Sequence, residues 1–435
     1  MHTLITREVP RGRVDCHPNA PTDWQKCPFG EVVEVNRPYS MERGREYPFL
    51  EMAAVKEDFG GIIEYDTRPF EGSLSRFALN DTLFAKITPC AENGKVALID
   101  RLPADNGAGS TEFIVLSPRA GFDPFFVYSL AISPDIHSRA VSRMEGSTGR
   151  LRVTEETFKK WMWVSIPQTL EEQLRIAETL KAADNHVRAL EEQLRKAERV
   201  KKALLQAIFV EGIPGRNGTP QTCRWGLAPA GWLETSIRAI LIEPVGNGTS
   251  PDAARQEPPG FPTLNVSSIR NGRCDQSRIS YIELSEKVAA TFAVNQGDFF
   301  VLRGNGNRDF VAIGGLLVEE PQAGLVFSDL LIRLRFDHSK ALPEFMKYLW
   351  QSPPFLRRLQ SYAVTGSGLW KIGQRSISRM KLAVPSDAGE QKDIAAIFDS
   401  QEGLLLALGN QLLAARRVKQ SLLQNLLTGK IRLKA

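Results

Sequence analysis

The sequence of 435 residues has few cysteines, no long apolar run and no apolar segment at its N-terminus. Its five cysteines form no Cys-x-x-Cys pair and are odd in number, which argues against a disulfide framework and against a zinc site. No run of about 18 apolar residues occurs, so no membrane span is expected. The first residues, MHTLITREVPRGR, lack the apolar core of a signal peptide. These absences predict a protein of the reducing cytoplasm.

Patterns that indicate catalysis are scarce as well. The five histidines are scattered and have no metal-ligand spacing, so no metal is expected. Gly304-Asn305-Gly306-Asn307 is rich in glycine, but it completes neither a Gly-x-Gly-x-x-Gly motif nor a phosphate-binding loop. It is interpreted as a turn that brings its backbone close to a ligand.

The net charge of +5 is unevenly distributed. Residues 1–168 have a net charge of −3, whereas residues 212–385 have a net charge of +6. A basic excess in one region permits binding to nucleic acid but does not demonstrate it.

The strongest feature is an internal repeat. Residues 167–213 align without a gap onto residues 385–431 at a constant offset of 218. The alignment pairs VKKALLQAIFVEGI with VKQSLLQNLLTGKI, and it pairs Pro167 with Pro385. Upstream, FFVYSLAISPDIHSRAVSRMEGSTGRLRV resembles EFMKYLWQSPPFLRRLQSYAVTGSGLWKI more weakly. The chain is therefore expected to alternate: domain, helix, domain, helix.

Each repeated segment has apolar residues alternately three and four positions apart, which is the pattern of a coiled-coil interface. The positions are Ile176, Leu180, Ala183, Val187, Leu190, Leu194, Ala197, Lys201, Leu204 and Ile208 in the first copy. In the second copy they are Ile394, Phe398, Gln401, Leu405, Leu408, Leu412, Ala415, Lys419, Leu422 and Leu426. Two helices of equal length are expected to pair with each other, parallel or antiparallel. The alternative is that each packs along a globular domain.

The remaining segments are rich in short strands. DTLFAKITPC, KVALIDR and TEFIVLS in the first domain, and GDFFVLRGNG, DFVAIGGLLV and DLLIRLRF in the second, are β-branched and aromatic runs broken by Gly, Asn and Pro. Residues 125–143 and 343–362 are each expected to form the main helix of a domain, followed by a Gly-Ser turn. The predicted class is α+β: two similar globular domains separated by two long helices that pair as a coiled coil.

Together these segments resemble the specificity subunits of type I restriction–modification systems. The resemblance rests on DTLFAKITPCAENGKVALI, on GSTEFIVLSP, and on the junction GSTGRLRVTEETFKKWMWVSIPQTLEEQLRIAETL, which AVPSDAGEQKDIAAIF repeats. It covers nearly the whole chain. It implies DNA target recognition domains at 1–168 and 212–385, with long helices at 169–211 and 386–435. It also implies partners: two modification subunits that carry S-adenosylmethionine, and restriction subunits.

The second junction departs from the pattern, because Gly389 stands where Glu171 stands in the first, and this weakens the expected helix start. Ser352-Pro353-Pro354-Phe355 resembles the tetrapeptide with which amino-methyltransferases hold a target amine. We reject that interpretation because no Gly-rich turn for S-adenosylmethionine precedes it and because its repeat, which starts at Ser133, lacks the motif. The chain itself is therefore expected to bind no cofactor and to be non-catalytic.

Recognition of DNA requires Arg, Lys, Asn or Gln side chains on exposed loops, for base edges and for phosphates. Loops flanked by glycine offer such side chains in both domains, although any one of them could be an ordinary solvated residue. The first-domain candidates are Lys86, Asn93, Lys95, Arg143, Ser147, Arg150 and Arg152. The second-domain candidates are Arg303, Asn305, Asn307, Arg308, Ser367, Lys371 and Arg375.

The sequence thus predicts a subunit that recognises a split, asymmetric target in double-stranded DNA. Each domain would recognise one half-site, and the helix pair would set the spacer. Two alternatives remain: an adaptor with two protein-binding domains on a coiled-coil spacer, and the specificity part of a split restriction–methylation enzyme.

Overall fold

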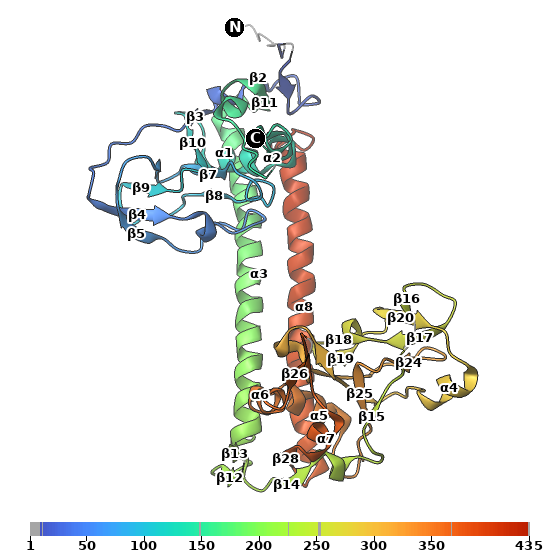
Figure 1. The fold of residues 1–435 in the computed structure, drawn as a ribbon. Coiled ribbons are helices and arrows are strands. Elements are labelled where there is room, and N and C mark those ends of the chain that lie inside the picture. The colour runs from blue at the N-terminus through green and yellow to red at the C-terminus, as the bar shows by residue number, and fades with distance from the viewer. Residues whose placement is uncertain are drawn as a thin grey trace. The chain divides into compact units, whose positions relative to one another are not determined.

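The computed structural model describes residues 9–10, 12–147, 149–224, 226–250, 254–366 and 368–433. The chain forms two compact units. Unit 1 comprises Met1–Glu191 with Asn410–Ala435, and unit 2 comprises Glu192–Gly409. Two long helices, α3 (Leu170–Glu211) and α8 (Ala388–Leu426), each contribute one end to each unit (Figure 1).

Unit 1 contains short strands and two short helices ahead of α3. The strands are β1 (Val14–Asp15), β2 (Gln25–Pro28), β3 (Val33–Val35), β4 (Glu46–Leu50), β5 (Asp66–Pro69), β6 (Ser75–Ala78), β7 (Thr82–Ala85), β8 (Val96–Leu98), β9 (Asn106–Gly109), β10 (Phe113–Pro118) and β11 (Met162–Ile166). The helices are α1 (Pro124–Ile132) and α2 (Pro134–Val141).

Unit 2 contains more strands and helices than unit 1, and they are also short. Its strands are β12 (Gln221–Cys223), β13 (Gly226–Ala228), β14 (Leu233–Ser236), β15 (Gly246–Asn247), β16 (Ala254–Arg255), β17 (Phe261–Leu264), β18 (Ile269–Arg270), β19 (Arg273–Cys274), β20 (Ile279–Ile282), β21 (Phe299–Leu302), β22 (Gly304–Asn305), β23 (Gly314–Leu316), β24 (Val326–Phe327), β25 (Leu331–Leu334), β26 (Val364–Gly366), β27 (Leu369–Lys371) and β28 (Lys381–Val384). Its helices are α4 (Glu286–Thr291), α5 (Pro343–Gln351), α6 (Pro353–Gln360) and α7 (Gln374–Arg379).

The two units share a sheet topology. The order β3-β10-β7-β8 in unit 1 corresponds to β15-β25-β21-β23 in unit 2, and every neighbouring pair in both runs is antiparallel. A second sheet in each unit contains one parallel pair, β4 with β9 and β17 with β24. The predicted class, two similar α+β domains, is confirmed.

The core of each unit includes both long helices. In unit 1, Ile176 and Leu180 of α3 lie in the same buried cluster as Leu426 of α8. In unit 2, Ile208 of α3 lies in one cluster with Phe398 of α8. The helices are therefore part of the domain cores, and their pairing is stabilised by the same apolar burial.

The predicted coiled-coil interface is confirmed. Each of the twenty interface positions is buried or partly buried in the structure. The pairing is antiparallel within each unit, because Asp184 pairs with Lys419 while Glu191, further along α3, pairs with Arg416, which is earlier in α8. In unit 2 the ring of Phe209 stacks on that of Phe398 with centroids 6.0 Å apart.

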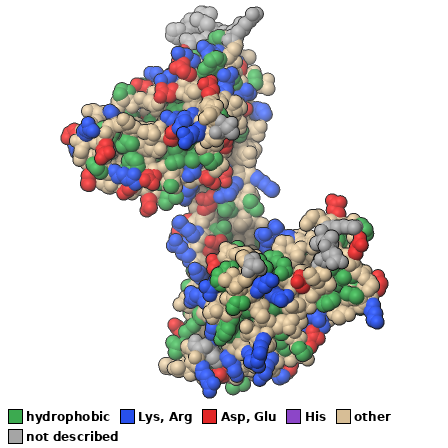
Figure 2. Space-filling model, in the orientation of Figure 1, with side chains coloured by type: hydrophobic (Ala, Val, Ile, Leu, Met, Phe, Trp, Pro, Cys, Tyr) green, Lys and Arg blue, Asp and Glu red, His purple; other side chains and the backbone are tan. Residues whose placement is uncertain are grey.

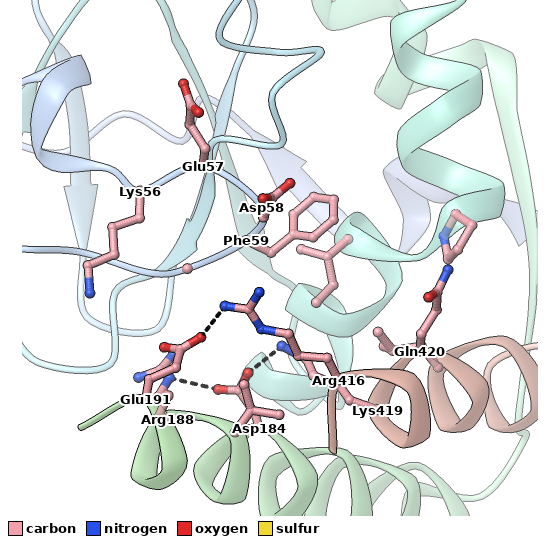
Figure 3. Close-up of a pocket in the computed structure, with 15 residues that line it drawn as sticks. Lys56, Glu57, Asp58, Phe59, Asp184, Arg188, Glu191, Arg416, Lys419 and Gln420 are labelled. Carbon is pink, nitrogen blue, oxygen red and sulfur yellow. Dashed lines mark hydrogen bonds and ion pairs between the residues drawn. The ribbon is translucent and has the colours of Figure 1, made fainter. Parts of the chain in front are cut away.

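Charged residues lie among these apolar positions, and the repeat places them symmetrically. In unit 1, Asp184 is 3% exposed and contacts Lys419 of the facing helix, as well as Arg188 at 2.8 Å (Figure 3). In unit 2, Lys201 of α3 contacts Glu402 of α8 at 3.0 Å. Since Asp184 aligns with Glu402 and Lys201 with Lys419, one repeated acid–base pair fixes the antiparallel register in both units.

The prediction of one main helix per domain was wrong in detail. In each unit the segment is two helices, separated at Ser133 and at Ser352. Proline follows each serine, and it disfavours the helical conformation of the residue before it. Ser352 is 1% exposed and its hydroxyl donates to the carbonyl oxygen of Leu349 at 2.7 Å.

The helix starts repeat as well. The side-chain amide of Gln173 donates to the carbonyl oxygen of Pro167 at 3.0 Å, and Gln391 donates to Pro385 at the same distance. Gly389 does not disrupt the second start, because Asp387 accepts a hydrogen bond from the Gly389 amide at 2.8 Å. This side chain satisfies one of the free amides at the helix N-terminus.

Among the residues that the structure describes, no helix is both long enough and apolar enough to cross a membrane.

Candidate nucleic-acid interface

In unit 2 a short hairpin brings together several of the candidates. Strands β26 and β27 pair with each other, and β27 pairs with β22, so that Gly304 faces Lys371 and Asn305 faces Trp370. The amide of Ile372 donates to the carbonyl oxygen of Arg303 at 2.8 Å, which continues the pairing. The loop after β21 and the hairpin therefore form one surface.

Unit 1 has the same arrangement. Arg152 bridges to Glu145 across the Gly-Ser turn and to Ile87 in the segment after β7. The amide of Val153 donates to the carbonyl oxygen of Lys86 at 2.8 Å, which matches the bond between Ile372 and Arg303 in unit 2. Lys86, Ser147, Arg150 and Arg152 are thereby gathered on one hairpin surface.

The side chains on the hairpin surface of unit 1 differ in whether they are already paired within the protein. Arg152 makes a bidentate contact to Glu112, at 2.9 and 2.8 Å, and this contact lowers the pKa of the Glu112 carboxyl. Arg150 and Ser147 are exposed beside the turn. Arg150 has no ion pair to any described residue, so its guanidinium is available to a ligand.

In unit 2 the loop is held by its own asparagines. Asn305 accepts a hydrogen bond from the amide of Asn307, and Asn307 accepts one from Asp309, at 2.9 and 3.0 Å. The guanidinium of Arg308 lies over the ring of Trp370, 5.1 Å from its centroid. Such stacking orients a planar guanidinium while leaving its N–H donors accessible.

Other candidates lie apart from the hairpins. Asn93 donates to Glu57 at 2.8 Å, and Lys95 donates to the carbonyl oxygen of Met52 at 3.0 Å. These bonds anchor neighbouring loops.

The remaining four candidates have different surroundings or lie outside the described residues. Arg143 lies over the ring of Trp161, 4.8 Å from its centroid. The partly buried Arg303 donates weakly to the carbonyl oxygen of Asp329, at 3.4 Å. Arg375 lies on α7, and Ser367 lies outside the described residues.

Sequence reasoning missed two arginines near Lys86. Arg37 and Arg76 line a hollow of about 410 Å³ together with Lys86. Arg76 donates to the carbonyl oxygen of Tyr39 at 2.8 Å. No sequence signal marks these residues, because neither lies in a Gly-flanked loop next to Lys86. Only folding brings them close to Lys86.

This architecture has counterparts among solved structures. One is a chain from a structure of the assembly and conformational transition of the type I R-M system, with 17% identity, a TM-score of 0.59, and coverage of 95% of this chain and 100% of that one. Another is a type I restriction–modification S subunit from M. genitalium, with 14% identity, a TM-score of 0.53, and coverage of 94% and 96%. The fold is thus that of a type I S subunit.

Comparison of the sequence with known proteins gives a second line of evidence. Residues 21–199 match the family model described as type I restriction modification DNA specificity domain. The EcoKI specificity subunit of Escherichia coli K12 is 27% identical over 62% of this chain and 58% of its own length. The EcoAI specificity subunit of Escherichia coli is 29% identical over 36% of this chain and 27% of its own length. Residues 21–199 thus match the DNA specificity domain of type I restriction–modification systems, and the chain is similar to the specificity subunits of these systems. The chain spans less than two thirds of the length of these relatives.

Proposed function

We propose that this chain gives a type I restriction–modification complex its DNA sequence specificity, with one half-site recognised by each unit. The observation that carries the proposal is the repeated hairpin surface. Both units pair the hairpin with the loop before it and share one matching backbone hydrogen bond, from Val153 to Lys86 and from Ile372 to Arg303, while the side chains that the surface presents differ. Equal scaffolds with different side chains suit a target whose two halves differ in sequence, since base edges are recognised by side chains.

The proposed partners are double-stranded DNA, two modification subunits and restriction subunits. The proposal assigns S-adenosylmethionine and the methyl transfer to the modification subunits, and it assigns no catalytic step to this chain. The environment of Ser352 supports this assignment, because its buried hydroxyl is already bonded to a backbone carbonyl and forms the turn between α5 and α6.

The test is to map methylated bases in cells that contain this chain and its modification partner. We expect Arg150→Ala to relax specificity in one half-site and Arg308→Ala to relax it in the other, each at a cost of about 1–3 kcal/mol. Each variant is the control for the other. A change in both half-sites from one substitution, or in neither half-site from both, would contradict the proposal.

The helix pair is proposed to set the unread spacer. Both helices are unbroken, and each is long, with 42 residues in α3 and 39 in α8. Inserting seven residues into each helix preserves the heptad pattern and adds about 10.5 Å of helix. At about 3.4 Å per base pair, the mapped spacer should grow by about three base pairs. An active complex with an unchanged spacer would contradict the proposal.

A further inference from the structure

Unit 2 contains a hollow whose lining is unusually basic. It has a volume of about 420 Å³ and lies between α6, α7, the start of β28 and the end of β12. Five cationic residues line it: Arg224, Arg358, Arg375, Arg379 and Lys381. No carboxylate is among the described residues of the lining. Figure 2 shows Lys and Arg side chains over the end of unit 2 where Figure 1 places β12, α7 and β28.

The two arginines that α7 contributes to this hollow, Arg375 and Arg379, differ in their pairing from other arginines of unit 2. Elsewhere in unit 2, Arg335 pairs with Asp298 at 2.6 Å and Arg216 with Asp393 at 2.6 Å. In the described part of the chain, by contrast, Arg375 and Arg379 make no ion pair. Like charges held together in a partly enclosed site repel one another, and a bound anion removes that repulsion.

Arg358 adds a fixed donor to this group. It donates to the carbonyl oxygen of Lys381 and to the sulfur of Met380, and its guanidinium lies 5.5 Å from the centroid of the Phe355 ring. It is partly buried, and this burial lowers the pKa of its guanidinium. An anion in the hollow would favour the charged form and would oppose that effect.

Unit 1 is built differently at the matching place. Trp161 stands six residues before Pro167, as Arg379 stands six residues before Pro385. The Trp161 ring is covered by two guanidinium groups, Arg13 at 4.4 Å and Arg143 at 4.8 Å from its centroid. The aromatic ring of unit 1 is therefore replaced by another cation in unit 2, which leaves an arginine-lined hollow.

We propose that this hollow binds a phosphate group. Planar guanidinium groups bind phosphate oxygens through paired, charge-assisted hydrogen bonds, and several arginines in one hollow suit a tetrahedral dianion. The phosphate is either a backbone phosphate of bound DNA, which rests on the proposed function, or a free phosphate. A DNA phosphate would position the duplex without contributing to base recognition.

The experiment uses the full chain with Arg375→Ala, Arg379→Ala and the control Arg357→Ala. Arg357 is exposed on α6, next to Arg358, but does not line the hollow. One arm measures the binding of inorganic phosphate by calorimetry. The other arm measures the affinity for duplex DNA as a function of salt concentration.

We expect Arg375→Ala and Arg379→Ala each to weaken phosphate binding by about tenfold or more, and Arg357→Ala to leave it unchanged. If the occupant is DNA, the slope of log affinity against log salt should also fall by about one for the two pocket variants. A loss of phosphate binding with an unchanged DNA slope identifies a free phosphate as the occupant. A fall in the DNA slope alone identifies the backbone.

The proposal is overturned if neither arm responds to Arg375→Ala or Arg379→Ala, or if Arg357→Ala has the same effect. Failure of the proposed function gives a different result. In that case the chain would bind no duplex DNA at all, while its binding of inorganic phosphate would still depend on Arg379.

Discussion

The two units neutralise the acid at one repeated helix position, Asp184 in unit 1 and Glu402 in unit 2, in different ways. In unit 1, Asp184 forms ion pairs with Lys419 and with Arg188, which lies four residues further along the same helix. In unit 2, Leu406 stands four residues after Glu402, and the additional cations come instead from Lys347 of α5 at 2.7 Å and from Arg273 of β19 at 3.1 Å. The repeated helix pairing thus tolerates exchange of its supporting charges, provided that a cation reaches the acid.

The hairpins show the same principle. A matching backbone hydrogen bond joins each hairpin to the preceding loop. The side chains differ: Glu112 pairs with Arg152 in unit 1, whereas Lys371 has no ion pair to any described residue in unit 2. Backbone geometry therefore maintains the scaffold, and the side chains are free to differ. Four sets of predictions test this comparison.

The largest effect is expected for Lys347→Met. Lys347 is 2% exposed and contacts both Glu402 and the hydroxyl of Tyr348. Its loss leaves the partly buried Glu402 with two cations, Lys201 and Arg273, so unit 2 should lose about 2 kcal/mol of unfolding free energy. Amide hydrogen exchange, measured separately for the two units, should become faster in unit 2 and should not change in unit 1.

Two further variants sharpen this test. Lys340→Met removes a lysine from a solvent-exposed pair in the same unit and should have little effect. Adding Leu406→Arg to Lys347→Met recreates the unit 1 arrangement and should recover part of the loss. If the double variant is no more stable than the single one, the two ways of neutralising the acid are not equivalent.

As the pH falls, unit 1 should begin to lose stability at a higher pH than unit 2. Burial lowers the pKa of both His17 and His137 in unit 1. A histidine whose folded pKa is lowered binds more protons when unfolded, so unit 1 should begin to lose stability as the pH falls below about 6.5. Hydrogen exchange at a series of pH values measures this directly, and His137→Gln should reduce the effect.

The acid transition of unit 2 has a different origin. Burial alone would raise the pKa of Glu402, but hydrogen bonds from Lys347 and Lys201 outweigh it and lower the pKa to about 2. The stability that the ionised Glu402 contributes is present above pH 4.5, its ordinary pKa, and is lost as the pH falls from about 4.5 to about 2. Glu402→Gln should remove this dependence, and loss of unit 2 before unit 1 would contradict the comparison.

The hairpins should differ in their contribution to DNA affinity. Lys371→Ala should reduce the salt slope of DNA binding by about one, because its ammonium group has no carboxylate partner in the described structure. Arg152→Ala should reduce the slope less, because Glu112 already neutralises Arg152. In unit 1, Glu112→Gln should increase the slope. Equal slopes for Lys371→Ala and Arg152→Ala would show that the pair with Glu112 opens on binding.

The smallest effect concerns the long helices. Helix α8 contains Gly389, Gly403 and Gly409, whereas α3 contains no glycine. A Cβ on Gly403 would meet no atom within 4 Å, so Gly403→Ala should stabilise unit 2 by about 1 kcal/mol. Asn185→Gly, at the matching place in α3, should destabilise unit 1. Thermal unfolding measures both, and destabilisation by Gly403→Ala would mean that the glycine has another role.

Much of this architecture was predictable from the sequence. The repeat and the spacing of the apolar residues predicted two long helices and the residues at their interface, because the helical period links sequence position to helix face. The Gly-Ser turns marked where each hairpin lies. The family resemblance came from the same segments.

The tertiary structure alone decided the antiparallel pairing, since the heptad pattern fits either direction and the choice depends on which residues face each other across the helices. It also decided which candidate side chains are engaged. Glu112 and Arg152 are 40 residues apart in sequence, and no local pattern announces their contact. The arginines of the unit 2 hollow come from separate elements that only folding brings together, so their shared surroundings, and the anion that they would bind, are properties of the fold.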